Sequence, residues 1–262
     1  MNAYSLSPED KIVKAKNGSK FRDLAIEISE LAKSAMITIV PFNEHELIYF
    51  STLEITKQIK ILNSLEIFLN VYKAVQAEGS SLLDSVRVIW NALVQLGYRP
   101  PSDLFSFIKT GDVIEIHSHE FVQLFRNLNF FNYCSYSLEE LYCVPVQELY
   151  SRDQQAMQNI INIAIPIFSG KVKDVVTIKF DPHIISESMS KARLKIKDQI
   201  KFMAPLFSTV DPSVAIISIE TAEIVDDTID IGLPDTSVAD ELVIENLVQL
   251  KPHFSAKPSS LS

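Results

Sequence analysis

Three residues that could bind a metal ion alternate along one short stretch of the sequence: Glu115, His117 and His119. Alternate residues of a β-strand point to the same face, so this spacing would present one carboxylate and two imidazoles together. Such groups bind iron, manganese and zinc, and His183 is a candidate third histidine. The same residues also fit an ordinary strand whose histidines lie at the surface or form hydrogen bonds. The sequence leaves both interpretations open.

Other residues that often act in catalysis or bind cofactors do not form a recognisable motif in this sequence. Eight residues separate Cys134 from Cys143, which is too wide for a redox pair, and we interpret both as buried apolar thiols. The sequence has no Gly-x-Ser-x-Gly nucleophile motif, and its 6 scattered glycines form no phosphate-binding loop. This favours a protein that is not an enzyme and has no identifiable cofactor. A metal-dependent enzyme that uses His117 and His119 is the alternative.

Composition and charge limit the class of protein and its partners. The 262 residues include 24 basic and 33 acidic side chains, a net charge of -9 that would repel nucleic acid and anionic membrane surfaces. The apolar runs are far shorter than the roughly 20 residues that a membrane helix needs. No secretory signal is recognised near the first residues. We therefore expect a folded, cytoplasmic protein that binds neither nucleic acid nor membrane.

The first part of the chain has helical periodicity. Apolar residues recur at intervals of three and four, and they predict helices over residues 19–35, 52–77 and 82–96. Short strands are predicted at residues 36–40 and 47–50. The last two helices form either a hairpin for dimerisation or simply part of the core. Near Lys109 the pattern of apolar residues changes from helical to strand-like, which marks the end of a mainly helical N-terminal region, residues 1–108.

The second part of the chain, residues 109–250, mixes strand and helix patterns. Branched apolar residues predict strands over residues 113–116, 172–180 and 214–225. Helical patterns cover residues 121–131, 138–149, 153–164 and 184–202. We expect a disordered tail over residues 251–262, where charge, Pro and Ser predominate. The fold class predicted is α+β, with a helical N-terminal region followed by an antiparallel sheet that has helices on one face.

Residues 127–141, with the sequence NLNFFNYCSYSLEEL, resemble the helical side of a PAS domain. That family often shows an Asn and an aromatic residue followed by Gly-Tyr-Ser-x-Glu-Glu-Leu, and this chain has Ser135 in place of the Gly. Tyr136 would then turn the chain and Ser137 would cap the next helix, while Leu141 would pack inward.

This resemblance covers about residues 111–225 and implies a five-stranded antiparallel sheet with small helices on one face. Domains of this kind sense small ligands or pair with partner proteins, and some carry haem or flavin, neither of which the sequence identifies. Six aromatic residues could line a ligand pocket or be plain core: Phe121, Phe125, Phe130, Phe131, Tyr133 and Tyr136. We expect a regulatory or sensory protein that binds a small molecule or a protein partner and forms a homodimer. A helical adaptor without a ligand is a further alternative.

Overall fold

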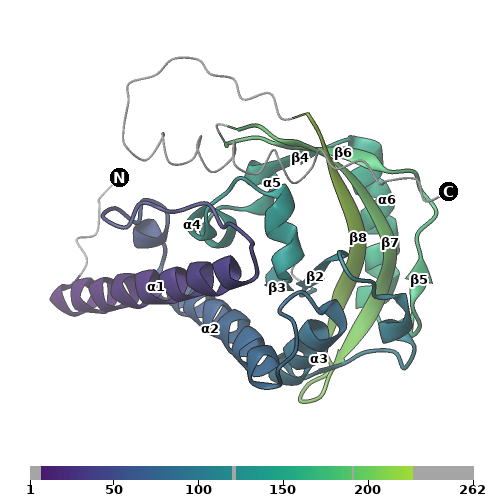
Figure 1. Ribbon diagram of the computed structural model, residues 1–262, viewed down its shortest axis with the longest axis horizontal. Helices are drawn as coiled ribbons and strands as arrows, with labels where there is room; N and C mark the ends of the chain where they lie inside the picture. Colours follow the sequence, from purple (N-terminus) through teal and green to yellow (C-terminus); the bar gives the residue numbers. More distant parts are fainter. Residues whose placement is uncertain (1–6, 120–121, 191, 227–262) are drawn as a thin grey trace.

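The computed structural model describes residues 7–119, 122–190 and 192–226. Its N-terminal region consists of three helices, α1 (Pro8–Ser34), α2 (Ile55–Ala77) and α3 (Ser85–Leu96) (Figure 1). Ser7 and Asp84 cap α1 and α3 by accepting backbone N–H groups, and Gly97 ends α3 in the left-handed conformation with φ 71°. The prediction of a helical N-terminal region is therefore confirmed.

Both short strands predicted in this region are wrong. Val40 makes only one isolated bridge, to Ser137, and residues Phe50–Thr52 form a single 3-10 turn, η1. A β-branched run becomes a strand only where a partner strand lies alongside it. Here the neighbouring elements are helices, so local propensity is overridden.

Within the described residues, eight strands form one antiparallel sheet that curls into a half-barrel (Figure 1). The main path runs in the order β3-β2-β8-β7-β6-β4, and β1 and β5 pair with β7. The strands are β1 (Tyr98–Arg99), β2 (Val113–His117), β3 (Gln123–Arg126), β4 (Tyr150–Arg152), β5 (Val176–Thr177), β6 (His183–Glu187), β7 (Lys195–Ser208) and β8 (Val214–Asp226). The predicted α+β fold, with a helical region followed by an antiparallel sheet, is confirmed. The strand predictions for residues 113–116 and 214–225 are also confirmed.

The prediction of a helix over residues 184–202 is wrong, because this stretch forms β6 and the first part of β7. From Leu194 to Ile200 every second side chain is buried, and the residues between them are exposed. This period of two is that of a strand with one covered face. The closely spaced lysines of the exposed face were interpreted as the solvent-exposed face of a helix, which led to the wrong prediction.

Other predicted elements are shorter or divided. The described part of the predicted aromatic helix forms β3 followed by a 3-10 helix, η3 (Leu128–Tyr133), and the strand predicted over residues 172–180 is only β5. Pro145 divides the next helix into α4 (Leu138–Cys143) and α5 (Val146–Leu149). A further 3-10 helix, η2 (Leu104–Phe107), precedes β2.

The helix α6 (Gln154–Phe168) begins at its cap Asp153, as predicted, but it continues beyond Ala164 and past Pro166. Pro166 lies in the last turn, where it forfeits only one backbone hydrogen bond. The predicted tail, residues 251–262, lies outside the described residues. None of the helices in the described part of the chain is long and apolar enough to cross a membrane.

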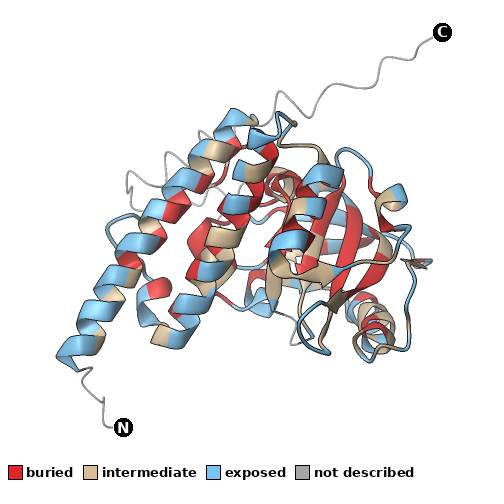
Figure 2. Ribbon diagram, turned by 90° about the horizontal axis from the view of Figure 1, so that it is seen from below, coloured by how far each residue is buried: buried red, intermediate tan, exposed pale blue. Residues whose placement is uncertain are grey.

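One buried apolar cluster joins the N-terminal helices to the sheet. Phe68 and Tyr72 of α2 pack against Phe125 of β3, with ring centroids 5.6 and 6.2 Å apart. The hydroxyl of Tyr72 accepts the backbone N–H of Leu128 at 2.7 Å. The same cluster includes Ile217 of β8, so residues before and after position 109 share a core (Figure 2).

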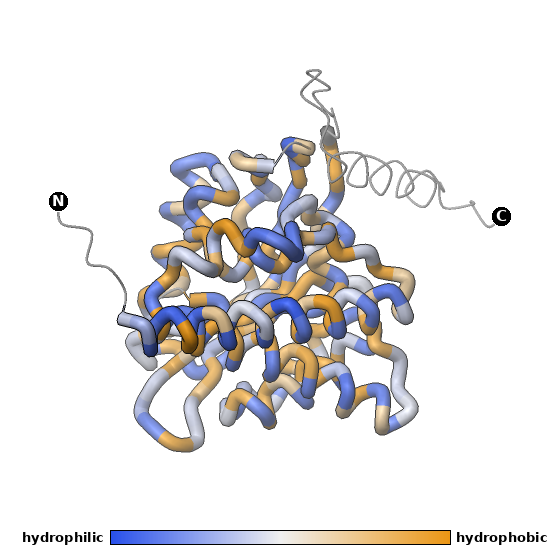
Figure 3. Tube along the Cα trace, turned by 90° about the vertical axis from the view of Figure 1, so that its left-hand side faces the viewer, coloured by the Kyte–Doolittle hydropathy of each residue, from blue (hydrophilic) through white to orange (hydrophobic). Residues whose placement is uncertain are grey.

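The opposite face of the sheet packs on α6. Ile217 belongs to the core shared with the N-terminal helices, whereas its neighbour Ile216 packs with Ala164 and Ile167 of α6. Consecutive strand residues point to opposite faces, so the central strands are covered on both sides (Figure 2). On the side of the molecule that carries α1, hydrophilic and hydrophobic residues alternate along the chain (Figure 3). This alternation is typical of helices with one buried face.

Tyr136 fastens the segment after β3 to the hairpin between β6 and β7. Its buried hydroxyl donates to the carbonyl of Leu149 at 2.5 Å and accepts the backbone N–H groups of Ser188 and Met189 at 3.1 and 3.0 Å. The expected cap also forms, because Ser137 and Glu140 make a reciprocal capping box at the start of α4. Leu141 is buried, as expected.

Glu187 completes this corner as a buried acceptor. Its carboxylate accepts the backbone N–H of Ser135 at 2.8 Å, the hydroxyl of Ser190 at 2.6 Å and the backbone N–H of Leu194 at 3.2 Å, and it also accepts the Ser135 hydroxyl. A buried carboxylate is tolerated where several donors satisfy it. Ser135 thus contributes two of these donors.

We expect Tyr136→Phe to lower the free energy of unfolding by about 2 kcal/mol, because it removes the buried hydroxyl that donates to the Leu149 carbonyl and accepts the backbone N–H groups of Ser188 and Met189. Urea denaturation followed by circular dichroism measures this change. Tyr98→Phe on the short strand β1 is the matched control and should change the stability by less than about 0.5 kcal/mol. A Tyr136→Phe variant as stable as the wild type would contradict the role of this hydroxyl.

Candidate functional site

Ionisable side chains gather on the face of the sheet that packs on α6. In an antiparallel sheet, paired residues point to the same face, and so do residues two apart on one strand. Glu115 pairs with Arg126, and His183 pairs with Asp198. When the register is followed across the main path, that face carries the following side chains, which we call the interior polar cluster: Glu115, His117, Arg126, Arg152, His183, Asp198 and Glu220.

The centre of the interior polar cluster is buried. The exposed fractions of Asp198, Arg126, Glu220 and His183 are 2%, 5%, 6% and 8%. A charge removed from water is costly unless an opposite charge or hydrogen bonds compensate for it. The protonation and pairing of these groups therefore decide whether this part of the fold is stable.

Glu115 and Arg126 form the ionised part of the cluster. Desolvation raises the pKa of Glu115, but electrostatic attraction, chiefly to the Arg126 guanidinium, outweighs it and lowers the pKa overall. The amide of Gln123 donates to the Glu115 carboxylate at 2.6 Å. The Arg126 guanidinium also lies over the Phe130 ring, 4.1 Å from its centroid, so its positive charge has two sources of stabilisation.

Asp198 and Glu220 form a coupled carboxyl pair. Burial raises the pKa of Asp198 to about 6, and burial together with the neighbouring charge of Asp198 raises the pKa of Glu220 well above its ordinary value. Glu220 therefore keeps its proton to a higher pH than an ordinary glutamate does. Burial lowers the pKa of His183 to about 4, so its imidazole is neutral, and its Nε2 lies 3.6 Å from Asp198 Oδ2.

Several buried atoms of the cluster have no hydrogen-bond partner among the described residues. They are Nε and Nη1 of Arg126, both ring nitrogens of His183, and Oδ2 of Asp198. Most buried polar atoms in proteins are hydrogen-bonded. The cluster thus contains buried cationic donors, a carboxylate oxygen and an imidazole whose hydrogen-bonding capacity is unused.

The sequence-based metal hypothesis gains little from this arrangement. Glu115, His117 and His183 do share one face, but His119 lies in the exposed loop after β2. Among the residues that the structure describes, no group of three or more His, Cys, Asp and Glu side chains could hold a metal ion. Burial lowers the pKa of His117, which keeps its imidazole neutral.

The aromatic candidates are divided among different places. Phe125 and Phe131 belong to the core shared with α2, and Phe130 lies against Arg126 of the cluster. Tyr133 is partly buried against the apolar residues of β6 and β7, and Tyr136 forms the corner described above. Phe121 lies outside the described residues. Among the candidates that the structure describes, Phe130 contacts the interior polar cluster through the Arg126 guanidinium.

The cysteines are consistent with the interpretation as unreactive thiols. Cys134 is buried and Cys143 partly so, and burial raises the pKa of both, that of Cys134 to about 12. A thiol that stays protonated is a poor nucleophile.

Sequence reasoning missed four members of the cluster: Arg126, Arg152, Asp198 and Glu220. Asp198 had a detectable signal, because it occupies a buried position in the alternation of β7, but that stretch was interpreted as a helix. The two arginines lie on short strands that no local pattern brings together. No protein-family model and no curated protein matches this chain.

Asp198 and His183 give folding opposite dependences on pH. An acid with a raised pKa stabilises the folded state while it is protonated, and this contribution is lost as the pH rises through the raised value. For Asp198 the loss runs from the usual pKa of 3.8 to about 6, which corresponds to about 2 to 3 kcal/mol. For His183, stability is lost as the pH falls from 6.5 to about 4.

Asp198→Asn should remove the pH dependence of stability that comes from Asp198 and leave the one that comes from His183. We expect the free energy of unfolding of this variant, relative to the wild type, to increase by about 2 kcal/mol between about pH 4 and pH 7. Urea denaturation at a series of pH values measures the difference. Asp174→Asn, at an exposed position, is the control and should show a constant difference. A constant difference for Asp198→Asn as well would contradict a raised pKa at this carboxyl.

Proposed function

We propose that this chain is a regulatory or sensory protein that acts by binding, and that the interior polar cluster of its half-barrel is the binding site. The observation that carries this proposal is the set of buried, unpartnered polar atoms on Arg126, His183 and Asp198. A cluster kept only for stability would gain by satisfying these atoms or by replacing them with apolar groups. Their retention is explained if they bind a molecule from outside the chain.

The topology supports the PAS-like part of this proposal. The path β3-β2-β8-β7-β6 is antiparallel throughout, and it follows the order 2-1-5-4-3 when these five strands are numbered along the chain. That is the strand order of a PAS sheet. The capping box at Ser137 and the corner at Tyr136 occupy the places that the motif implies.

The charges of the cluster indicate the class of ligand. Arg126 has two unpartnered N–H groups, which suit a carboxylate or another small anion. Asp198 has an unpartnered oxygen, which suits an ammonium or another donor. A small zwitterion, such as a free amino acid, satisfies both groups at once.

Ligand binding would be transmitted to a partner protein through an exposed apolar surface on α3. Val86, Trp90 and Val94 recur every fourth residue on α3, and all three are exposed. An apolar stripe of this kind suits a protein partner or a second copy of the chain. Such an output suits the cytoplasmic location that composition predicts.

A thermal shift experiment on the full chain tests ligand binding. We expect at least one of the common free amino acids, at millimolar concentration, to raise the melting temperature. A concentration 100 times Kd stabilises by about 2.7 kcal/mol, or roughly 5 to 10 °C for a chain of this size.

Arg126→Gln should abolish this shift, because it removes the cationic donors. Arg99→Gln, on the short strand β1, should retain it, because Arg99 pairs with Phe207, nine residues along β7 from Asp198. If no amino acid shifts the melting temperature, or if the shift survives in Arg126→Gln, the proposed site is wrong.

A further inference from the structure

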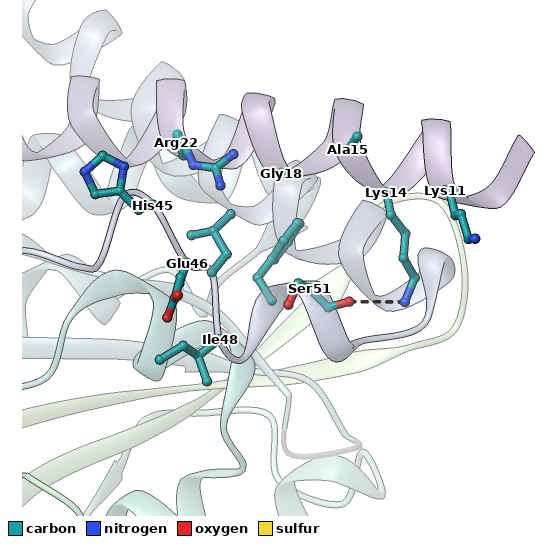
Figure 4. Close-up of a pocket in the computed structure, with 11 residues that line it drawn as sticks. Lys11, Lys14, Ala15, Gly18, Arg22, His45, Glu46, Ile48 and Ser51 are labelled. Atoms are coloured by element: carbon teal, nitrogen blue, oxygen red, sulfur yellow. Dashed lines mark hydrogen bonds between the residues drawn. The ribbon is translucent and has the colours of Figure 1, made fainter. Parts of the chain in front are cut away.

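A groove separate from the interior polar cluster runs along α1. It has a volume of about 550 Å³ and lies between one side of α1 and residues 45–51 (Figure 4). Ala15 and Gly18 contribute small residues to the helix wall, and Leu47 and Phe50 line the opposite wall. The middle of the groove is therefore apolar.

Basic side chains stand at both ends of the groove. Lys11 and Lys14 lie at one end, and Arg22 and His45 lie at the other (Figure 4). Glu46 is the single acidic residue of the lining. The groove is thus cationic on a chain whose net charge is -9.

These cations make no direct ion pair with a described acid, although the charge of Arg22 also acts on the nearby Glu139 carboxyl. Lys14 Nζ donates to the Ser51 carbonyl at 3.2 Å, and Arg22 Nε donates to the Glu44 carbonyl at 2.5 Å. Neither lysine nor Arg22 forms an ion pair with an acid among the residues that the structure describes. Carbonyl oxygens orient these side chains and leave their positive charge available to an anion.

The spacing of the charges defines the occupant. Residues 11 and 22 of a helix are separated by roughly 16 Å along the axis. An extended peptide of six residues spans about the same length. The groove therefore fits a short extended segment that has acids at its two ends and apolar side chains between them.

We propose that residues 240–245 of this chain bind in the groove. Their sequence is Asp-Glu-Leu-Val-Ile-Glu, with acids at both ends and three branched apolar residues in the middle. The strand β8 ends at Asp226, and the stretch from there to Asp240 extends to about 45 Å. A compact domain of this size has a radius of gyration of only about 17 Å, so the segment can reach the groove of its own chain.

Such binding makes the groove an autoinhibitory or protective contact. The segment covers the apolar floor, and its acids neutralise both basic ends. An acidic partner peptide would then have to displace it to bind there. This inference does not depend on the ligand proposed for the interior polar cluster.

Zero-length carbodiimide cross-linking of the full chain, followed by peptide mass spectrometry, tests the proposal. The reagent joins a carboxylate to an amine only where they are in contact. We expect links from Lys11 or Lys14 to an acid of residues 240–245, within one chain. The double variant Lys11→Glu, Lys14→Glu should lower the yield of links between α1 and this segment at least fivefold.

Two further variants make the result specific. The matched control Lys16→Glu, Lys57→Glu changes the same charge at exposed positions outside the groove, and it should keep the wild-type yield. A charge-reversed variant combines Lys11→Glu and Lys14→Glu with Asp240→Lys and Glu241→Lys. It should restore the links, which now join a carboxylate on α1 to an amine at residues 240 and 241. The proposal would be overturned if the links join two copies of the chain or reach only acids outside residues 240–245. It would also be overturned if the Lys11→Glu, Lys14→Glu variant gave the wild-type yield of links.

Discussion

The positive and negative charges buried on one face of the curled sheet must offset each other. The other elements of the fold hold these charges in the positions that allow this. The interior polar cluster contains the carboxyl groups of Glu115, Asp198 and Glu220 but only two guanidinium groups, those of Arg126 and Arg152. Burial favours the neutral forms of Glu220 and His183, so the negative charge on this face lies mainly on Glu115 and Asp198, opposite the two guanidiniums. Each ionised group then has an opposite charge nearby, which offsets the cost of desolvation. A further charge that enters this face would disturb the balance.

The surrounding elements hold the strands that carry these charges. The N-terminal helices share a core with β2, β3 and β8, and α6 packs on the opposite face of the central strands. The corner formed by Tyr136 and Glu187 ties the segment after β3 to β6 and β7. Arg126 and Asp198 therefore lie on strands that these contacts hold in place.

Local features of the sequence predicted part of this fold. The helices α2 and α3, the strand β2, and the cap at Ser137 depend on neighbouring residues, so periodicity and capping patterns were sufficient to find them. The stretch from Ile184 to Phe202 was predicted wrongly because its exposed lysines hid an alternation of period two. The interior polar cluster is not local at all. Its members come from six strands, and only the register of the sheet brings Arg152 near Glu220.

The central claim is that these carboxyl groups titrate as one buried, coupled set. The most direct measurement is an NMR titration of the side-chain carboxyl carbons of Glu115, Asp198 and Glu220 in the full chain. We expect Glu115 to ionise below its ordinary pKa, Asp198 to titrate near 6, and Glu220 to ionise well above its ordinary pKa. If all three carboxyl groups instead titrate independently at ordinary values, the cluster is not a buried coupled set and the account is contradicted.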